Sequence, residues 1–135
     1  MFDKKLVLEI LEQIRNAIQT IQRRFEPIRT ANDFTDSEAG VEKLDAICMQ
    51  LIAIGESLKN IDRITDNSLL PKYPDIDWKK IKGMRDIISH HYFDVDADLI
   101  YDVCANHIVK LGETIRTMIN GLRSESFDLQ PLSSV

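Results

Sequence analysis

The sequence has few of the residues that interrupt or cross-link a chain. Its 135 residues include five glycines, four prolines and two cysteines. With so few glycines and prolines, and no turn residues separating short alternating apolar runs, long helices are favoured over a sheet. Cys48 and Cys104 lie in apolar helical patterns without metal-ligand spacing, so we expect both to be reduced and buried. Such thiols are typical of a cytoplasmic protein.

Long apolar runs and familiar cofactor motifs are also missing. No apolar run reaches 18 residues, and the chain enters an amphipathic pattern directly after Asp3, so we predict neither a membrane span nor a signal peptide. There is no HExxH, no CxxC and no glycine-rich phosphate loop, so we expect no metal and no cofactor. The net charge of -5 means that any contact with RNA must rely on a local basic patch.

Apolar residues recur at helical spacing along four segments, which are residues 3–25, 36–61, 77–91 and 96–122. Asp3 and Asp77 are suited to cap the first and third of them. These patterns predict an all-α fold, a helical bundle in which the third helix is the shortest. We expect one domain over residues 1–122 and a flexible tail over residues 123–135. The apolar stripes are wide enough to serve a dimer interface as well as a core.

The third segment carries an arginine where a leucine would be expected. Its stripe at three-and-four spacing consists of Trp78, Ile81, Arg85, Ile88 and Tyr92. Burying a guanidinium without a partner is costly. Arg85 is therefore either paired inside the protein or facing a cleft or a second subunit.

Two residues of the second segment are candidates to meet Arg85. Gly55 lies in the helix interior, where glycine costs about 1 kcal/mol relative to alanine, and close approach of another backbone is the usual compensation. Glu56 follows at the edge of the stripe, where its carboxylate is either solvated or reaches Arg85. In the fourth segment, His107 lies among apolar residues and is expected to be a hydrogen-bonded core or boundary histidine.

A basic run precedes Arg85 and consists of Lys79, Lys80 and Lys82. It is either a solvated lysine face or a rim that attracts phosphate to Arg85. At 100° per residue, Ser89 and Tyr92 share the face of Arg85, whereas His90 lies about 140° away. Bringing Arg85 and His90 together would require the helix to loosen near His90, or a two-fold dimer.

Arginine and histidine are suited to metal-independent cleavage of RNA. A histidine with a pKa near 6.5 acts as general base on a 2′-hydroxyl or as general acid on the leaving oxygen. An arginine holds the phosphate and stabilises the charge that develops there. The spacing of Arg85 and His90 alone does not establish RNA cleavage, because adjacent histidines at a helix end can also cap backbone carbonyls.

The stretch Arg-Asp-Ile-Ile-Ser-His-His-Tyr, residues 85–92, resembles the Arg-x4-His-x-Tyr motif of HepT-type HEPN toxins. The flanks are similar too: Ile-Gly-Glu at 54–56, Pro-Asp-Ile-Asp-Trp at 74–78 and Tyr-Phe-Asp-Val-Asp at 92–96. The similarity covers about residues 3–120 in layout and is specific between 74 and 96. Asp86 departs from the asparagine that many members carry there.

The resemblance implies an HEPN-type antiparallel four-helix bundle that is homodimeric, with its cleft at the dimer interface. It implies an endoribonuclease toxin of a type VII-like toxin–antitoxin pair in which Arg85 and His90 are catalytic. It further implies a minimal nucleotidyltransferase (MNT) antitoxin that transfers AMP to Tyr92. Supporting roles would fall to Asp86, Ser89, His91 and Glu56.

Two other functions stay open at this stage. One is a non-catalytic HEPN interaction module that dimerises and binds a nucleotidyltransferase. The other is a bundle that binds a nucleotide or another small ligand without any toxin role.

Overall fold

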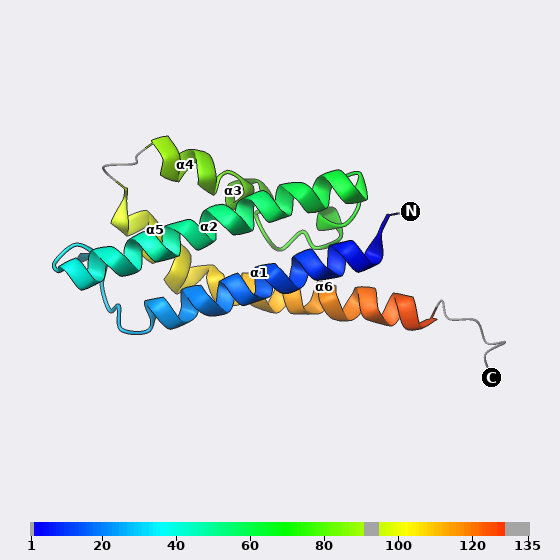
Figure 1. Ribbon diagram of the computed structural model, residues 1–135, viewed down its shortest axis with the longest axis horizontal. Helices are drawn as coiled ribbons and strands as arrows, with labels where there is room; N and C mark the ends of the chain where they lie inside the picture. The colour runs from blue at the N-terminus through cyan, green and yellow to red at the C-terminus, as the bar shows by residue number, and fades with distance from the viewer. Residues whose placement is uncertain (1, 91–94, 129–135) are drawn as a thin grey trace.

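A computed structural model describes residues 2–90 and 95–128, and every regular element in these ranges is helical. Six α-helices and two short 3₁₀-helices follow one another in this part of the chain (Figure 1). The α-helices are α1 (Lys4–Phe25), α2 (Glu38–Thr65), α3 (Trp78–Lys82), α4 (Met84–His90), α5 (Ala97–Asn106) and α6 (Ile108–Asp128). The 3₁₀-helices are η1 (Ala31–Phe34) and η2 (Leu70–Lys72). The all-α prediction is confirmed.

The two long N-terminal helices form over the first two predicted apolar stripes, with α1 capped at Asp3 as expected and α2 capped at Ser37. The Asp3 carboxylate accepts a hydrogen bond from the Leu6 amide at 3.1 Å, and the Ser37 hydroxyl accepts one from the Gly40 amide at 3.0 Å. These contacts satisfy amide groups that have no partner within the first turn of a helix. The buried face of α1 has the expected spacing and consists of Val7, Leu11, Ile14, Ile18 and Ile21.

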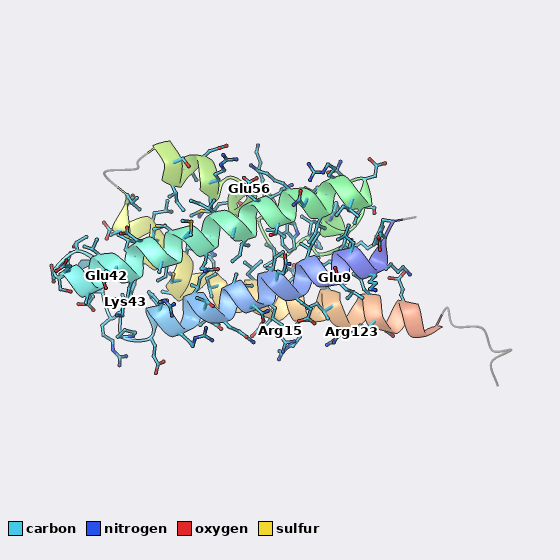
Figure 2. All side chains as sticks on the ribbon, viewed as in Figure 1. Glu9, Arg15, Glu42, Lys43, Glu56 and Arg123 are labelled. Carbon is cyan, nitrogen blue, oxygen red and sulfur yellow. The ribbon has the colours of Figure 1, made fainter. Side chains whose placement is uncertain are left out.

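Helix α2 lies in the middle of the molecule. It packs against α1 on one side and against α3 and α4 on the other, while α6 runs along α1 (Figure 1). Ion pairs join α1 to the end of α6, where Arg123 Nη2 lies 2.7 Å from Glu12 Oε1 and Lys4 Nζ lies 3.7 Å from Glu125 Oε1 (Arg123 is labelled in Figure 2). This arrangement leaves α3 and α4 on the outer side of α2, away from α1.

The continuous third helix predicted over residues 77–91 is wrong, because the segment breaks at Gly83. The Gly83 amide donates to the Lys79 carbonyl at 3.0 Å, which ends α3, and a new helix starts at Met84. Trp78, Met84 and Ile88 are buried, whereas Arg85 is exposed. The break therefore gives Met84 the core position that a single stripe had assigned to Arg85.

The fourth predicted helix is also divided, at His107, whose backbone leaves the helical region with φ -125°. Its side chain is about half exposed, so a core position is wrong, whereas Nε2 lies 3.3 Å from Asp102 Oδ2, which fits the alternative of a hydrogen-bonded boundary histidine. Helix α6 then continues to Asp128, six residues beyond the expected end at residue 122. No helix in the described ranges is both long and apolar enough to cross a membrane.

Both cysteines are free and buried, as predicted. Burial raises the pKa of the Cys48 thiol to about 11, with a smaller contribution from the Asp45 charge. Burial likewise raises the pKa of the Cys104 thiol to about 12, with a smaller contribution from Cys48. The two thiols therefore behave as small apolar side chains between the helices.

Candidate active site around Arg85

A glycine on α2 allows the end of α3, just before the helix that carries Arg85, to approach α2 closely. A Cβ atom on Gly55 would lie 3.0 Å from the Ile81 carbonyl oxygen and 3.4 Å from that of Lys82. The predicted approach of another backbone to Gly55 is therefore confirmed, and that backbone is the end of α3. Because α4 follows α3 directly after Gly83, this contact also fixes where α4 begins beside α2.

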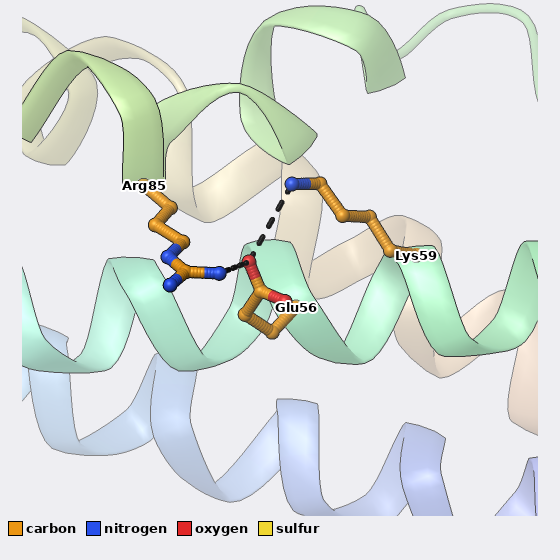
Figure 3. A network of polar contacts seen from close by, with 3 residues as sticks. All are labelled: Glu56, Lys59 and Arg85. Carbon is orange, nitrogen blue, oxygen red and sulfur yellow. Dashed lines mark hydrogen bonds and ion pairs between the residues drawn. The ribbon is translucent and has the colours of Figure 1, made fainter.

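Arg85 meets Glu56 across the contact between α4 and α2. Arg85 Nη1 lies 3.4 Å from Glu56 Oε1, and Lys59 Nζ lies 3.5 Å from the same oxygen (Figure 3). The Arg85 side chain is 56% exposed and that of Glu56 is 41% exposed. Exposed pairs of this kind contribute about 0–1 kcal/mol to stability, so the network orients its members more than it stabilises the fold. Arg85 was expected either to be paired inside the protein or to face a cleft or a second subunit. In the structure it is paired with Glu56 of the same chain, and its side chain is also open to solvent.

The three lysines of the predicted rim face different surroundings. Lys79 and Lys82 line an open hollow of about 430 Å³ together with Lys59, Gly83, Asp62 and Asp86. Lys82 Nζ is held 2.5 Å from Asp62 Oδ2, so part of the positive charge beside Arg85 is neutralised locally. Lys80 lines a different cavity. The structure thus brings Lys79 and Lys82 to one surface with Lys59 and leaves Lys80 apart.

The second cavity has a volume of about 290 Å³ and lies between α2, α3 and the junction of α5 with α6. Its floor consists of buried apolar side chains that include Leu51, Met84 and Leu111, and its edge includes Lys80 and His107. The Asn106 side chain donates to Asp102, which lowers the pKa of that carboxyl below its ordinary value, and nearby His107 and Lys80 act in the same direction. No group of three potential metal ligands occurs within the described ranges.

The remaining motif residues follow Arg85 along α4. Asp86 and Ser89 are exposed, and α4 ends at His90. His91 and Tyr92 lie outside the described residues. The backbone stays helical from Met84 to His90, so the helix does not loosen between Arg85 and His90 and the angle of about 140° between these two positions persists.

Two residues of this surface, Lys59 and Asp62, were not predicted from the sequence. Both lie on α2, three and six residues after Glu56, so they continue its row along the helix toward α3. Spacing of three residues between charged side chains on a predicted helix is the signal that would have placed them beside Glu56.

Comparison with known proteins identifies the family to which the chain belongs. The family model described as "Ribonuclease HepT-like" matches residues 7–118. The chain belongs to the HepT-like ribonuclease family. The match spans α1 to the middle of α6 and includes Glu56 and the whole stretch from Arg85 to Tyr92. The family expectation drawn from residues 85–92 is therefore confirmed.

Archaeal relatives show the same membership at about 30% identity. A protein of Methanocaldococcus jannaschii, named provisionally as an RNase, is 30% identical over 96 residues, covering 70% of this chain and 76% of its own. A second M. jannaschii protein, named as a gamma-glutamylcyclotransferase and provisionally as an RNase, is 32% identical over 88% of this chain, which spans half of its length. A protein of Thermococcus cleftensis named as a probable ribonuclease HepT is 29% identical over 76% of this chain and 86% of its own. No solved structure matches the chain significantly.

Proposed function

We propose that this protein is a metal-independent endoribonuclease toxin that acts as a homodimer, with Arg85 and His90 as its catalytic residues. The observation that carries the proposal is membership in the HepT-like ribonuclease family over a region that contains both residues. The names of the relatives, which refer to RNase activity, give further support.

The surface of α4 is suited to a site completed by a second copy. Met84 and Ile88 form the buried face of α4, and the position of His90 lies about 140° from the centre of that face. Ile87 is exposed on the same helix. A second copy packed against α4 about a two-fold axis would cover Ile87 and place an Arg85 and a His90 from different chains on one phosphodiester.

The chemistry uses groups that this chain carries itself. One histidine accepts the proton of the 2′-hydroxyl while its oxygen attacks phosphorus and the bond from phosphorus to the 5′-oxygen breaks. The leaving 5′-oxygen takes a proton from the second histidine, and the product carries a 2′,3′-cyclic phosphate. The guanidinium of Arg85 binds the phosphate oxygens through paired N–H groups, which stabilises the charge that grows on them. Lys79 and Lys82 draw the RNA backbone toward this surface.

Neutralisation would occur at Tyr92, by transfer of AMP from an MNT-type nucleotidyltransferase antitoxin. An added nucleotide brings negative charge and bulk close to Arg85, which would exclude the RNA phosphate. The pair would act in the cytoplasm, where reduced thiols such as Cys48 and Cys104 persist.

The test of catalysis is cleavage of a single-stranded RNA by purified protein in excess chelator. Wild-type protein should release fragments with cyclic phosphate ends, and His90→Ala should lose activity by about a hundredfold or more, the usual range for removal of a general acid–base group. Circular dichroism of the variant controls for folding. Strong cleavage by His90→Ala protein would refute the assignment of His90.

The test of neutralisation is the intact mass of the protein after co-expression with an MNT-type partner. Wild-type protein should gain the mass of one or more AMP groups and lose RNase activity, whereas Tyr92→Phe should gain none. A Tyr92→Phe protein with the same added mass would place the modification on another residue.

The second candidate function is a non-catalytic HEPN module that dimerises and binds a nucleotidyltransferase. Exposed apolar side chains on α2 and α4 favour contact with a second protein chain, which such a module requires. In that case Arg85→Ala would weaken the dimer, measured by analytical ultracentrifugation, while the wild-type protein would leave RNA intact.

A further inference from the structure

Glu56 occupies the point where α2 and α4 meet, and its contacts differ from those of a solvated surface carboxylate. One of its oxygens, Oε1, is within reach of both Arg85 Nη1 and Lys59 Nζ, at 3.4 Å and 3.5 Å (Figure 3). Arg85 approaches from α4 and Lys59 from one turn further along α2. A single carboxylate therefore links the exposed arginine to the longest helix of the described chain.

The two helices differ in how firmly they are held. Helix α2 has 28 residues and a buried face along its length, whereas α4 has seven residues and follows the break at Gly83. A long arginine side chain that is 56% exposed on such a short helix has many rotamers available. An anchor on α2 restricts those rotamers, and Gly55, the residue before the anchor, keeps the adjoining α3 backbone within close contact.

The contact with Glu56 also leaves the guanidinium able to bind a phosphate. Guanidinium has five N–H donors in a planar fork, and phosphate is bound through two parallel N–H groups. The contact to Glu56 is made through one nitrogen, Nη1. An Arg85 held at that nitrogen can present the opposite edge of the fork to substrate.

We propose that Glu56 is the positioning residue of Arg85, holding the guanidinium in the orientation in which it receives the scissile phosphate of RNA. The proposal rests on the ribonuclease function proposed above and deepens it. Lys59 competes for the same oxygen and so weakens the hold of Glu56 on Arg85. Glu56 itself does not touch the RNA, and its negative charge slightly opposes RNA binding.

This role predicts a separation between rate and affinity in Glu56→Gln. The single-turnover cleavage rate at saturating RNA should fall about tenfold or more, because misplacement of a catalytic group by a fraction of an ångström is costly. The dissociation constant for RNA should stay equal or decrease, because one negative charge is removed near the phosphates. Glu56→Asp keeps the charge but is one methylene shorter, so it should lose rate as well.

Glu42→Gln is the matched control. It makes the same chemical change on the same helix. Glu42 lies near the start of α2, several turns away from Glu56 (Figure 2). Its cleavage rate should equal that of the wild type. Equal rates for Glu56→Gln and wild type would overturn the proposal, as would full activity in Glu56→Asp, which would assign the effect to charge rather than to contact.

A measurement without RNA separates this inference from the proposed function. The NMR order parameter of the Arg85 Nε–Hε group should fall in Glu56→Gln and stay unchanged in Glu42→Gln. If wild-type protein fails to cleave RNA, the proposed function is refuted while this measurement still tests the contact. If wild-type protein cleaves RNA and the Arg85 signal is the same in Glu56→Gln, the positioning role is refuted alone.

Discussion

Replacing Gly55 by alanine tests how closely α3 is seated on α2. The new Cβ would lie 3.0 Å from the Ile81 carbonyl oxygen, which is tighter than ordinary contact, so the α3 backbone has to move by a few tenths of an ångström. Overpacking of this kind costs about 1–3 kcal/mol, whereas the alanine gains about 1 kcal/mol in helix propensity. The free energy of unfolding should therefore decrease by about 1 kcal/mol.

Gly112→Ala is the matched control in α6. Its Cβ would meet one methyl carbon, Ile18 Cγ2, at 3.4 Å, an ordinary contact, so helix propensity should raise the free energy of unfolding by about 0.5–1 kcal/mol. The two variants should differ by about 2 kcal/mol, or about 8 °C in melting temperature for a chain of this size. Urea unfolding followed by far-UV circular dichroism measures the difference. A Gly55→Ala protein as stable as Gly112→Ala would refute the close approach of α3 to α2.

Two further predictions concern titratable groups. The lowered pKa of the Asp102 carboxyl, due first to its hydrogen bond from Asn106, implies stability that is present above the unfolded pKa of about 4 and is lost as the pH falls through the folded pKa. The difference in urea midpoint between wild type and Asp102→Asn should therefore be present at neutral pH and disappear on acidification, and a difference that persists in acid would contradict this. Because burial raises the pKa of Cys48 to about 11 and that of Cys104 to about 12, iodoacetamide should label both at least about a hundredfold more slowly in folded than in urea-unfolded protein. Rapid labelling of folded protein, followed by mass spectrometry, would show that the thiols are not enclosed.

The first two helices could be predicted from the sequence because local signals and packing agree there. The stripes of constant spacing and the cap at Asp3 are visible in the sequence, and the structure uses them and adds a cap at Ser37. The break at Gly83 was missed because the stripe from Trp78 through Ile81 to Ile88 has helical spacing across it. Only the packing against α2 shows that Met84, and not Arg85, completes the core.

The break at His107 had no local signal, since neither glycine nor proline occurs there. It results from how α5 and α6 each pack, with Cys104 and Ile108 both buried on either side of an exposed histidine. The cavity beside it was equally hidden, because its lining comes from α2, from the segment before α4 and from the α5–α6 junction. Pattern analysis places residues on a helix face but does not bring distant segments together.

At the candidate site, the sequence did suggest a contact between two residues that lie far apart in the chain. An arginine in an apolar stripe and a glutamate at the edge of another left two alternatives open, a solvated glutamate or a pair, and in the structure Arg85 and Glu56 do meet. The reason given for the pair was burial, yet both side chains are well exposed, so a low-dielectric environment does not explain the contact. An exposed pair contributes little to stability, so the fold has little need of it. Its position between a firmly held helix and a short one is better explained by the orientation of Arg85, which is the quantity that the Glu56 variants measure.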